Sequence, residues 1–194
     1  MQGPINASLA ATDLACRRGD RLLFRGLSLT LKPREVIHVT GANGIGKSSL
    51  LRILGGLLRP FAGEVTRHGA IGLVDERPAL DPELPLGRAL GFWRTIDAVP
   101  DTNVPWQLES LLDVPVRYLS TGQKKRAALA RLSAQGAPIW LLDEPLNGLD
   151  HRGISMVGAM VESHCRAGGI CVLASHQPFP LDGMRVLDLS EFAA

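Results

Sequence analysis

Cysteines and aromatic residues are scarce in this chain of 194 residues. The three cysteines, Cys16, Cys165 and Cys171, are odd in number and lack the spacing of metal ligands, which argues against a disulfide framework or a zinc site. We expect them to be buried, reduced thiols that act as small hydrophobic residues. Because aromatic residues make up only 5% of a sequence that is 45% hydrophobic, aliphatic side chains must fill most of the core.

Long apolar runs and a strong charge imbalance are also missing. No apolar run approaches the roughly 18–20 residues that a membrane-spanning helix needs, and residues 1–10 lack the basic and apolar blocks of a signal peptide. The sequence therefore predicts a cytoplasmic protein with no direct membrane insertion. The formal net charge is +2, whereas a nucleic-acid-binding domain usually carries a concentrated basic surface. We accordingly expect no nucleic acid partner.

Segments of strand and helix character alternate along the chain, which predicts an α/β fold with a parallel sheet and helices on both faces. The length fits one domain over residues 1–194. The proline-rich segment 75–118 predicts a small inserted helical subdomain, which with the following helix covers about 76–135. The first two strands form a hairpin and the last strand lies at an edge. The expected strands are 7–15, 21–31, 35–40, 63–67, 69–74, 139–142, 170–174 and 185–189, and the expected helices begin at Lys47 and cover 86–96, 106–112, 120–135 and 153–166.

A glycine-rich segment between a buried strand and a helix fits the pattern G-x-x-x-x-G-K-[ST]. Its glycines let successive backbone N–H groups point at phosphate oxygens, and the helix N-terminus adds about half a positive charge. Lys47 can reach the β- and γ-phosphates, and the Ser48 hydroxyl can ligate Mg²⁺. The sequence therefore predicts a site for ATP and Mg²⁺ built from Gly41, Ala42, Asn43, Gly44, Ile45, Gly46, Lys47, Ser48 and Ser49.

Two carboxylates follow the apolar strand 139–142. Because ligands gather at the carboxyl ends of parallel strands, Asp143 is placed to hold the metal and Glu144 to polarise a water molecule aimed at the γ-phosphate. A strand that simply ends in solvated acids would explain the pair equally well if it stood alone. The phosphate-binding pattern upstream favours the catalytic interpretation.

The segment 119–123, Leu-Ser-Thr-Gly-Gln, opens the helix 120–135. This segment lies between the phosphate loop and the strand 139–142, and with these motifs in this order the chain resembles the ATP-binding-cassette ATPases over almost its whole length. The signature of that family reads LSGGQ, and Thr121 here replaces the first glycine. Without that resemblance, the segment is an ordinary N-cap of an amphipathic helix. The resemblance implies a P-loop NTPase core with a parallel sheet, an antiparallel β lobe and a small helical subdomain. It further implies a head-to-tail homodimer in which Ser120, Gly122 and Gln123 cap the γ-phosphate bound by the second subunit.

The resemblance implies roles for three further positions. The loop 146–150 would touch the partner subunit, and His176 would be the switch histidine that contacts the γ-phosphate. Glu76 stands where the family usually has a glutamine that binds Mg²⁺, so it is the third candidate metal ligand. The aromatic residue that usually stacks on adenine is missing. Arg17 and Arg18 occupy that place, and an arginine can stack on a base.

The segments 118–133 and 168–179 resemble the haem-exporter ATPases of bacterial cytochrome c maturation. The resemblance implies permease partners, a peripheral position on the cytoplasmic face of the inner membrane, and ATP hydrolysis tied to release or export of a haem-loaded carrier. The alternatives are an exporter of lipoproteins, drugs or metals, a soluble cassette protein that acts on ribosomes or DNA, and a nucleotide-binding regulator that does not hydrolyse ATP. The basic cluster Lys124, Lys125 and Arg126 is expected to stay solvated or to add positive potential near the nucleotide.

Overall fold

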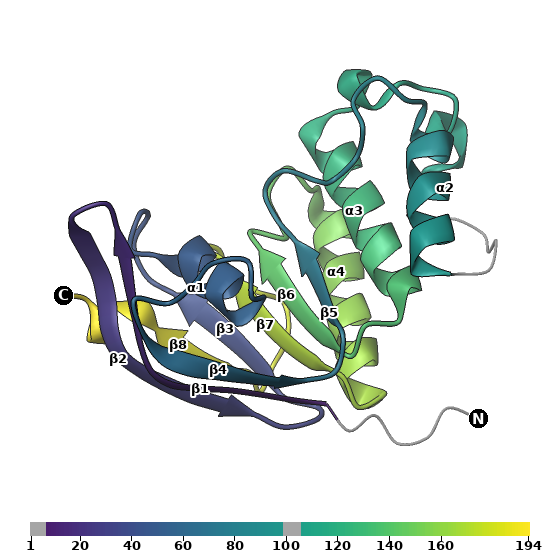
Figure 1. Cartoon of the computed structure of the whole chain (residues 1–194). Coiled ribbons are helices and arrows are strands. Elements are labelled where there is room, and N and C mark those ends of the chain that lie inside the picture. Colours follow the sequence, from purple (N-terminus) through teal and green to yellow (C-terminus); the bar gives the residue numbers. More distant parts are fainter. Residues whose placement is uncertain (1–6, 99–105) are drawn as a thin grey trace.

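The computed structural model describes residues 7–98 and 106–194 (Figure 1). The expectation of no signal peptide rests mainly on the first six residues, which lie outside the described part. Residues 99–105 of the expected inserted subdomain also lie outside it. The extent of a single domain over 1–194 stays a prediction.

Two sheets form the framework, as the sequence predicts. The antiparallel sheet has the order β2-β1-β4, and its strands are β1 (Ser8–Arg18), β2 (Arg21–Leu31) and β4 (Ala62–His68). The parallel sheet has the order β5-β6-β7-β3-β8, and its strands are β3 (Val36–Thr40), β5 (Ile71–Val74), β6 (Ile139–Asp143), β7 (Ile170–Ala174) and β8 (Arg185–Asp188). The predicted hairpin and the predicted edge strand β8 are confirmed. The neighbouring strands β4 and β5 belong to different sheets.

The helices follow the sequence pattern, with one exception. They are α1 (Lys47–Leu54), α2 (Leu86–Asp97), α3 (Thr121–Gln135) and α4 (His151–Arg166), with short 3₁₀ turns η1 (Glu109–Leu111), η2 (Val116–Tyr118) and η3 (Leu189–Phe192). The helix α4 begins two residues before its predicted start because the Asp150 side chain accepts a hydrogen bond from the Gly153 N–H and caps the helix.

The expected helix 106–112 is wrong. Trp106 and Gln107 have φ angles of 87° and 56°, which no right-handed helix contains, and only η1 forms a turn further on. Trp106 is 6% exposed and joins the core beneath α2 and α3. Because this large ring is buried in the core, the backbone at Trp106 and Gln107 takes a non-helical conformation despite the helical sequence pattern of the segment.

The central strands of the parallel sheet are buried on both faces. In β6, Ile139 and Leu141 pack toward α1 and the antiparallel sheet, whereas Trp140 and Leu142 pack toward α3 and α4. One face is thus covered by helices and the other by α1 together with a second sheet. Figure 1 shows the antiparallel sheet and the helices α2 and α3 at opposite ends of the molecule. The ends of the central strands lie between these two parts.

The cysteines are all buried and unpaired. Burial raises the pKa of each thiol, that of Cys165 to about 11. Within the described residues, no helix is both long enough and apolar enough to cross a membrane.

Candidate functional site

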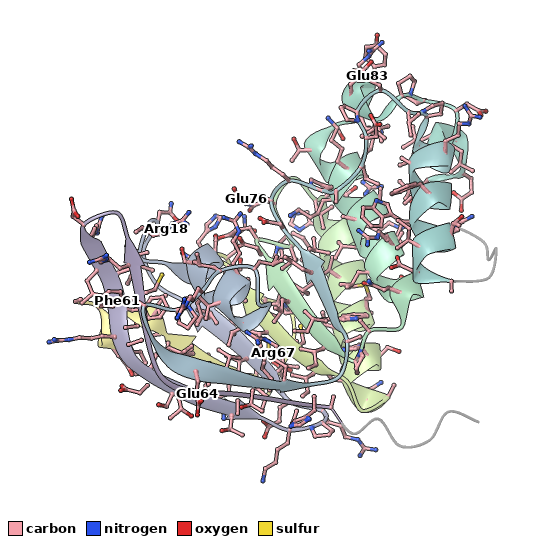
Figure 2. The ribbon with its side chains drawn as sticks, in the orientation of Figure 1. Arg18, Phe61, Glu64, Arg67, Glu76 and Glu83 are labelled. Atoms are coloured by element: carbon pink, nitrogen blue, oxygen red, sulfur yellow. The ribbon has the colours of Figure 1, made fainter. Side chains whose placement is uncertain are left out.

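A cleft of about 580 Å³ brings together the phosphate loop, the end of β6 and the hairpin of β1 and β2. Figure 2 shows Arg18, at the end of β1, and Glu76, just after β5, on the same side of the molecule. Most of the predicted site residues therefore meet in one place. The cleft is lined by Arg18, Arg21, Leu23, Asn43, Gly44, Gly46, Lys47, Ser48, Ser49, Glu76, Glu144, Asn147 and His176.

The phosphate loop has the backbone conformation that its glycines permit. Gly41, Gly44 and Gly46 have φ angles of 130°, 77° and 118°, a region that other residues rarely adopt. Lys47 is buried, and its Nζ donates to the carbonyl oxygens of Gly41 at 2.8 Å and Ala42 at 3.2 Å. The Lys47 side chain thus lies folded against the same loop that would bind a phosphate. The carbonyl of Gly46 accepts a hydrogen bond from the Leu50 N–H, so the first turn of α1 begins directly after the loop.

Asp143 and Ser48 form the part of the site that fits a metal ion. Asp143 is buried, the Ser48 side chain lowers the pKa of its carboxyl, and its Oδ1 has no hydrogen-bond partner among the described residues. Burial raises the pKa of Asp143, and the carboxylates of Asp75, Glu76 and Glu144 raise it further, against the Ser48 bond. An unpartnered buried oxygen beside a hydroxyl is the kind of ligand that Mg²⁺ prefers, so these residues fit the metal.

Glu144 is held in an unusual conformation immediately after β6. Its φ angle is 46°, its N–H donates to the Ala174 carbonyl at 2.8 Å, and its Oε2 lies 2.9 Å from Nδ1 of His176. Strained positions of this kind cluster at functional sites. The structure thus brings the predicted base and the predicted switch histidine into direct contact.

The signature residues lie elsewhere. Ser120, Gly122 and Gln123 do not line the cleft of their own chain. Ser120 and Gln123 form a reciprocal capping box at the start of α3, in which Ser120 Oγ accepts from the Gln123 N–H at 3.2 Å and Gln123 Oε1 accepts from the Ser120 N–H at 2.8 Å. Their side chains therefore order the N-terminus of this helix.

The loop 146–150 is packed against that helix terminus. A Cβ atom on Gly122 would lie 2.2 Å from the carbonyl oxygen of Gly148, and Arg126 reaches Asp150 at 3.5 Å. Asn147, in the same loop, lines the cleft. The signature and the cleft are thus connected through a backbone contact that only glycine allows.

Three lining residues were not predicted: Arg21, Leu23 and Asn147. Residues 18 and 21 are partners across the β1–β2 hairpin, so the hairpin pattern in the sequence could have placed Arg21 beside Arg18. The structure also separates the two arginines that replace the missing aromatic residue. Arg17 lies over the exposed ring of Phe61, 4.7 Å from its centre, and does not line the cleft, whereas Arg18 does.

The expectation that the basic cluster stays solvated is wrong for Lys125, whereas the alternative, positive potential near the nucleotide, stays a prediction. Lys125 is 3% exposed, and Arg126 pairs with Asp150. The helix α3 must turn its apolar side to the sheet, and Lys125 lies on that side.

The chain belongs to the ABC transporter family, which matches residues 24–147. The cytochrome c biogenesis ATP-binding export protein CcmA of Novosphingobium aromaticivorans is 61% identical over 95% of this chain and 96% of its own. The protein of the same name in Zymomonas mobilis is 48% identical over 97% of this chain and 87% of its own. A solved structure of an ABC transporter ATP-binding protein from Pyrococcus furiosus superimposes with a TM-score of 0.80 at 23% identity, covering 96% of this chain and all of that one. The fold is accordingly that of an ABC ATPase.

The glycine contact predicts a specific sensitivity. Gly122→Ala should destabilise the protein by about 2 kcal/mol or more, because the new methyl group meets the Gly148 backbone rather than a movable side chain. Gly91→Ala is the matched control, since Gly91 is also helical but has open space at its Cβ position and should gain about 0.5–1 kcal/mol. Urea unfolding of both variants measures the difference, and equal stabilities would contradict the packing argument.

The environment of Asp143 predicts opposite effects on stability and on metal use. Its pKa is raised in the folded protein, so the ionised carboxylate opposes folding above the ordinary aspartate pKa of about 3.9. Asp143→Asn should therefore raise the thermal midpoint of the nucleotide-free protein near neutral pH, with a gain that shrinks as the pH falls toward 3.9. The same change should abolish stimulation of ATP hydrolysis by Mg²⁺.

Asp113→Asn, at an exposed position, is the control for the loss of one carboxylate. A variant at Asp143 that unfolds at a lower temperature and keeps its response to Mg²⁺ would refute the assignment of the metal ligand.

Proposed function

We propose that the chain is the ATP-hydrolysing subunit of an ABC membrane transporter of cytochrome c biogenesis, with haem or a haem-loaded carrier as the exported species. The observation that carries the proposal is the cleft in which Lys47, Ser48, Glu144 and His176 meet. The similarity to proteins named as cytochrome c biogenesis export proteins supports the pathway.

In this proposal the loop 41–46 holds the phosphates with its backbone N–H groups, and the Lys47 ammonium exchanges its two carbonyl partners for phosphate oxygens. Ser48 and Asp143 hold Mg²⁺, with Glu76 at the rim of the cleft as a further oxygen ligand. When bound, the metal ion would offset the negative charge of the β- and γ-phosphates.

Glu144 acts as the general base. Its contact with His176 orients the carboxylate, whose oxygen can accept a proton from the attacking water. A protonated His176 ring can donate from Nδ1 to Glu144 and from Nε2 to a phosphate oxygen. The histidine would thus link the base to the γ-phosphate.

A second copy of the chain completes the site. Ser120, Gly122 and the N-terminus of α3 would make an anion-binding surface, and they do not line the cleft of their own chain. In a head-to-tail homodimer this surface would contact the γ-phosphate held by the partner. The dimer would bind membrane permease subunits at the cytoplasmic face of the inner membrane and pass on to them the conformational change that accompanies ATP hydrolysis.

Glu144→Gln should lower ATP hydrolysis about 100-fold or more and leave nucleotide binding intact, because the amide cannot accept the proton. With ATP and Mg²⁺ the variant should elute as a dimer in size-exclusion chromatography and should capture its partners from detergent-solubilised native membranes. Lys47→Ala, which removes the phosphate contact, is the control and should stay monomeric. Recovery of cytochrome c maturation membrane proteins is expected. Recovery of another permease would overturn the pathway, and recovery of ribosomes or nucleic acid would overturn the transporter assignment.

Arg18 is proposed to hold the nucleotide base, since it lines the cleft while Arg17 is occupied by Phe61. Arg18→Ala should weaken ATP binding about fivefold, the loss of a stacked guanidinium, whereas Arg17→Ala should change it little. Arg18→Tyr should restore the affinity. Inorganic triphosphate separates base from phosphate contacts, because a base-stacking arginine contributes nothing to its binding. A fivefold loss of triphosphate affinity in Arg18→Ala would show a phosphate contact instead.

A further inference from the structure

A lysine is buried behind the metal-binding carboxylate. Lys125, on the first turns of α3, is 3% exposed. Its Nζ donates to the backbone carbonyls of Asp143 at 3.3 Å and of Asp75 at 3.4 Å. One side chain of the signature helix therefore joins the end of β6 to the residue that follows β5.

The ammonium group remains charged in this position only if nearby carboxylates compensate for its lost hydration. Burial lowers the pKa of Lys125, and the carboxylates of Asp143, Glu76, Asp75 and Glu144 raise it. Two carbonyl oxygens satisfy two of its three donors. The carboxylates of the cleft thus offset part of the cost of burying the lysine.

Three of these carboxylates have other partners. Asp75 accepts from Nη2 of Arg52 at 2.8 Å and from Nε at 3.2 Å, Glu144 contacts His176, and the Ser48 side chain lowers the pKa of Asp143.

Glu76 differs from them. Its N–H donates to Asp75 Oδ1 at 2.6 Å, which fixes its backbone. Its carboxylate makes no hydrogen bond or ion pair with a described residue, although it lines the cleft where the phosphates would lie. Glu76 is thus a negative charge at the cleft without a contact partner.

We infer that Lys125 is a positioning and charge-balancing residue whose buried ammonium offsets the Glu76 carboxylate and ties the backbone just before Glu76 to that of Asp143. The inference rests on the proposed function for the identity of the ligand, Mg²⁺ with ATP. The pairing of the two charges is a property of the free chain and can be measured without a ligand.

The first experiment is a double-mutant cycle on thermal unfolding of the nucleotide-free full chain. Lys125→Met removes the charge at similar length and leaves the carbonyl oxygens of Asp75 and Asp143 without their donor. The thermal midpoint should therefore fall by roughly 5 °C, although burial by itself disfavours the ammonium. In the Glu76→Gln background the same change should cost about half as much, because one repelling carboxylate has been removed. A lysine that only supplies hydrogen bonds to two carbonyls would lower the midpoint equally in both backgrounds, which would overturn the inference.

Two further variants separate charge from other effects. Lys125→Gln keeps a hydrogen-bond donor and loses the charge, so it should show the same dependence on residue 76. If Lys125→Met does not fold, this variant completes the cycle. Lys124→Met removes the same charge from the neighbouring position, where Nζ donates to the Arg117 carbonyl, and should show no dependence on residue 76.

The second experiment measures binding of a fluorescent ATP analogue in excess EDTA. Loss of the Lys125 charge should weaken binding of the metal-free nucleotide roughly tenfold, and Glu76→Gln should strengthen it. The double variant should bind within about twofold of the original chain, since the two charge changes cancel. An undiminished tenfold loss in the double variant would overturn charge balancing. Absence of binding by the unaltered chain when Mg²⁺ replaces EDTA would refute the proposed function, and the unfolding cycle would still decide the pairing of Lys125 with Glu76.

Discussion

Charged groups buried at the end of β6 are the constraint on which the rest of the site depends. Asp143 and Lys125 are almost fully buried, and Glu144 adopts a left-handed backbone conformation beside them. Such groups are costly in a protein interior unless hydrogen bonds and opposite charges compensate for lost water. The contacts with Ser48, His176 and the carbonyls of two strand ends provide this compensation. These contacts hold the backbone and the carboxylates at the strand end in place.

The helix α3 links this buried cluster to a surface that serves another molecule in our proposal. Lys125 on its inner side contacts the ends of two strands, while the capping box and Gly122 at its N-terminus form the signature surface. The Gly122–Gly148 contact joins that surface to the loop that carries Asn147 into the cleft. Movement of α3 would thus alter the cleft of its own chain and the signature surface together. A connection of this kind between the cleft and the signature surface suits the proposed dimer, in which two sites are shared between the subunits.

Much of the fold and of the site could be predicted from the sequence. The phosphate loop was predictable because its glycines are required by local backbone geometry, and Asp143 and Glu144 because a parallel sheet collects the ends of its strands at one edge. The helix expected at 106–112 failed because burial of Trp106 overrides local preference. The burial of Lys125 was missed because a basic triplet in a helix is normally solvated, and only the partners across the fold make a buried ammonium tolerable.

The sequence by itself determined where most strands and helices lie along the chain, the phosphate-binding loop and the residues available for hydrolysis. These features depend on local backbone preferences and on short spacings. The tertiary structure alone decided which arginine faces the cleft, that Glu144 and His176 touch, and that Lys125 lies among carboxylates contributed by two separate segments. Those outcomes depend on contacts between residues that are far apart in the chain. Their energies are set by burial and by neighbouring charges, which exist only once the sheets and helices have packed.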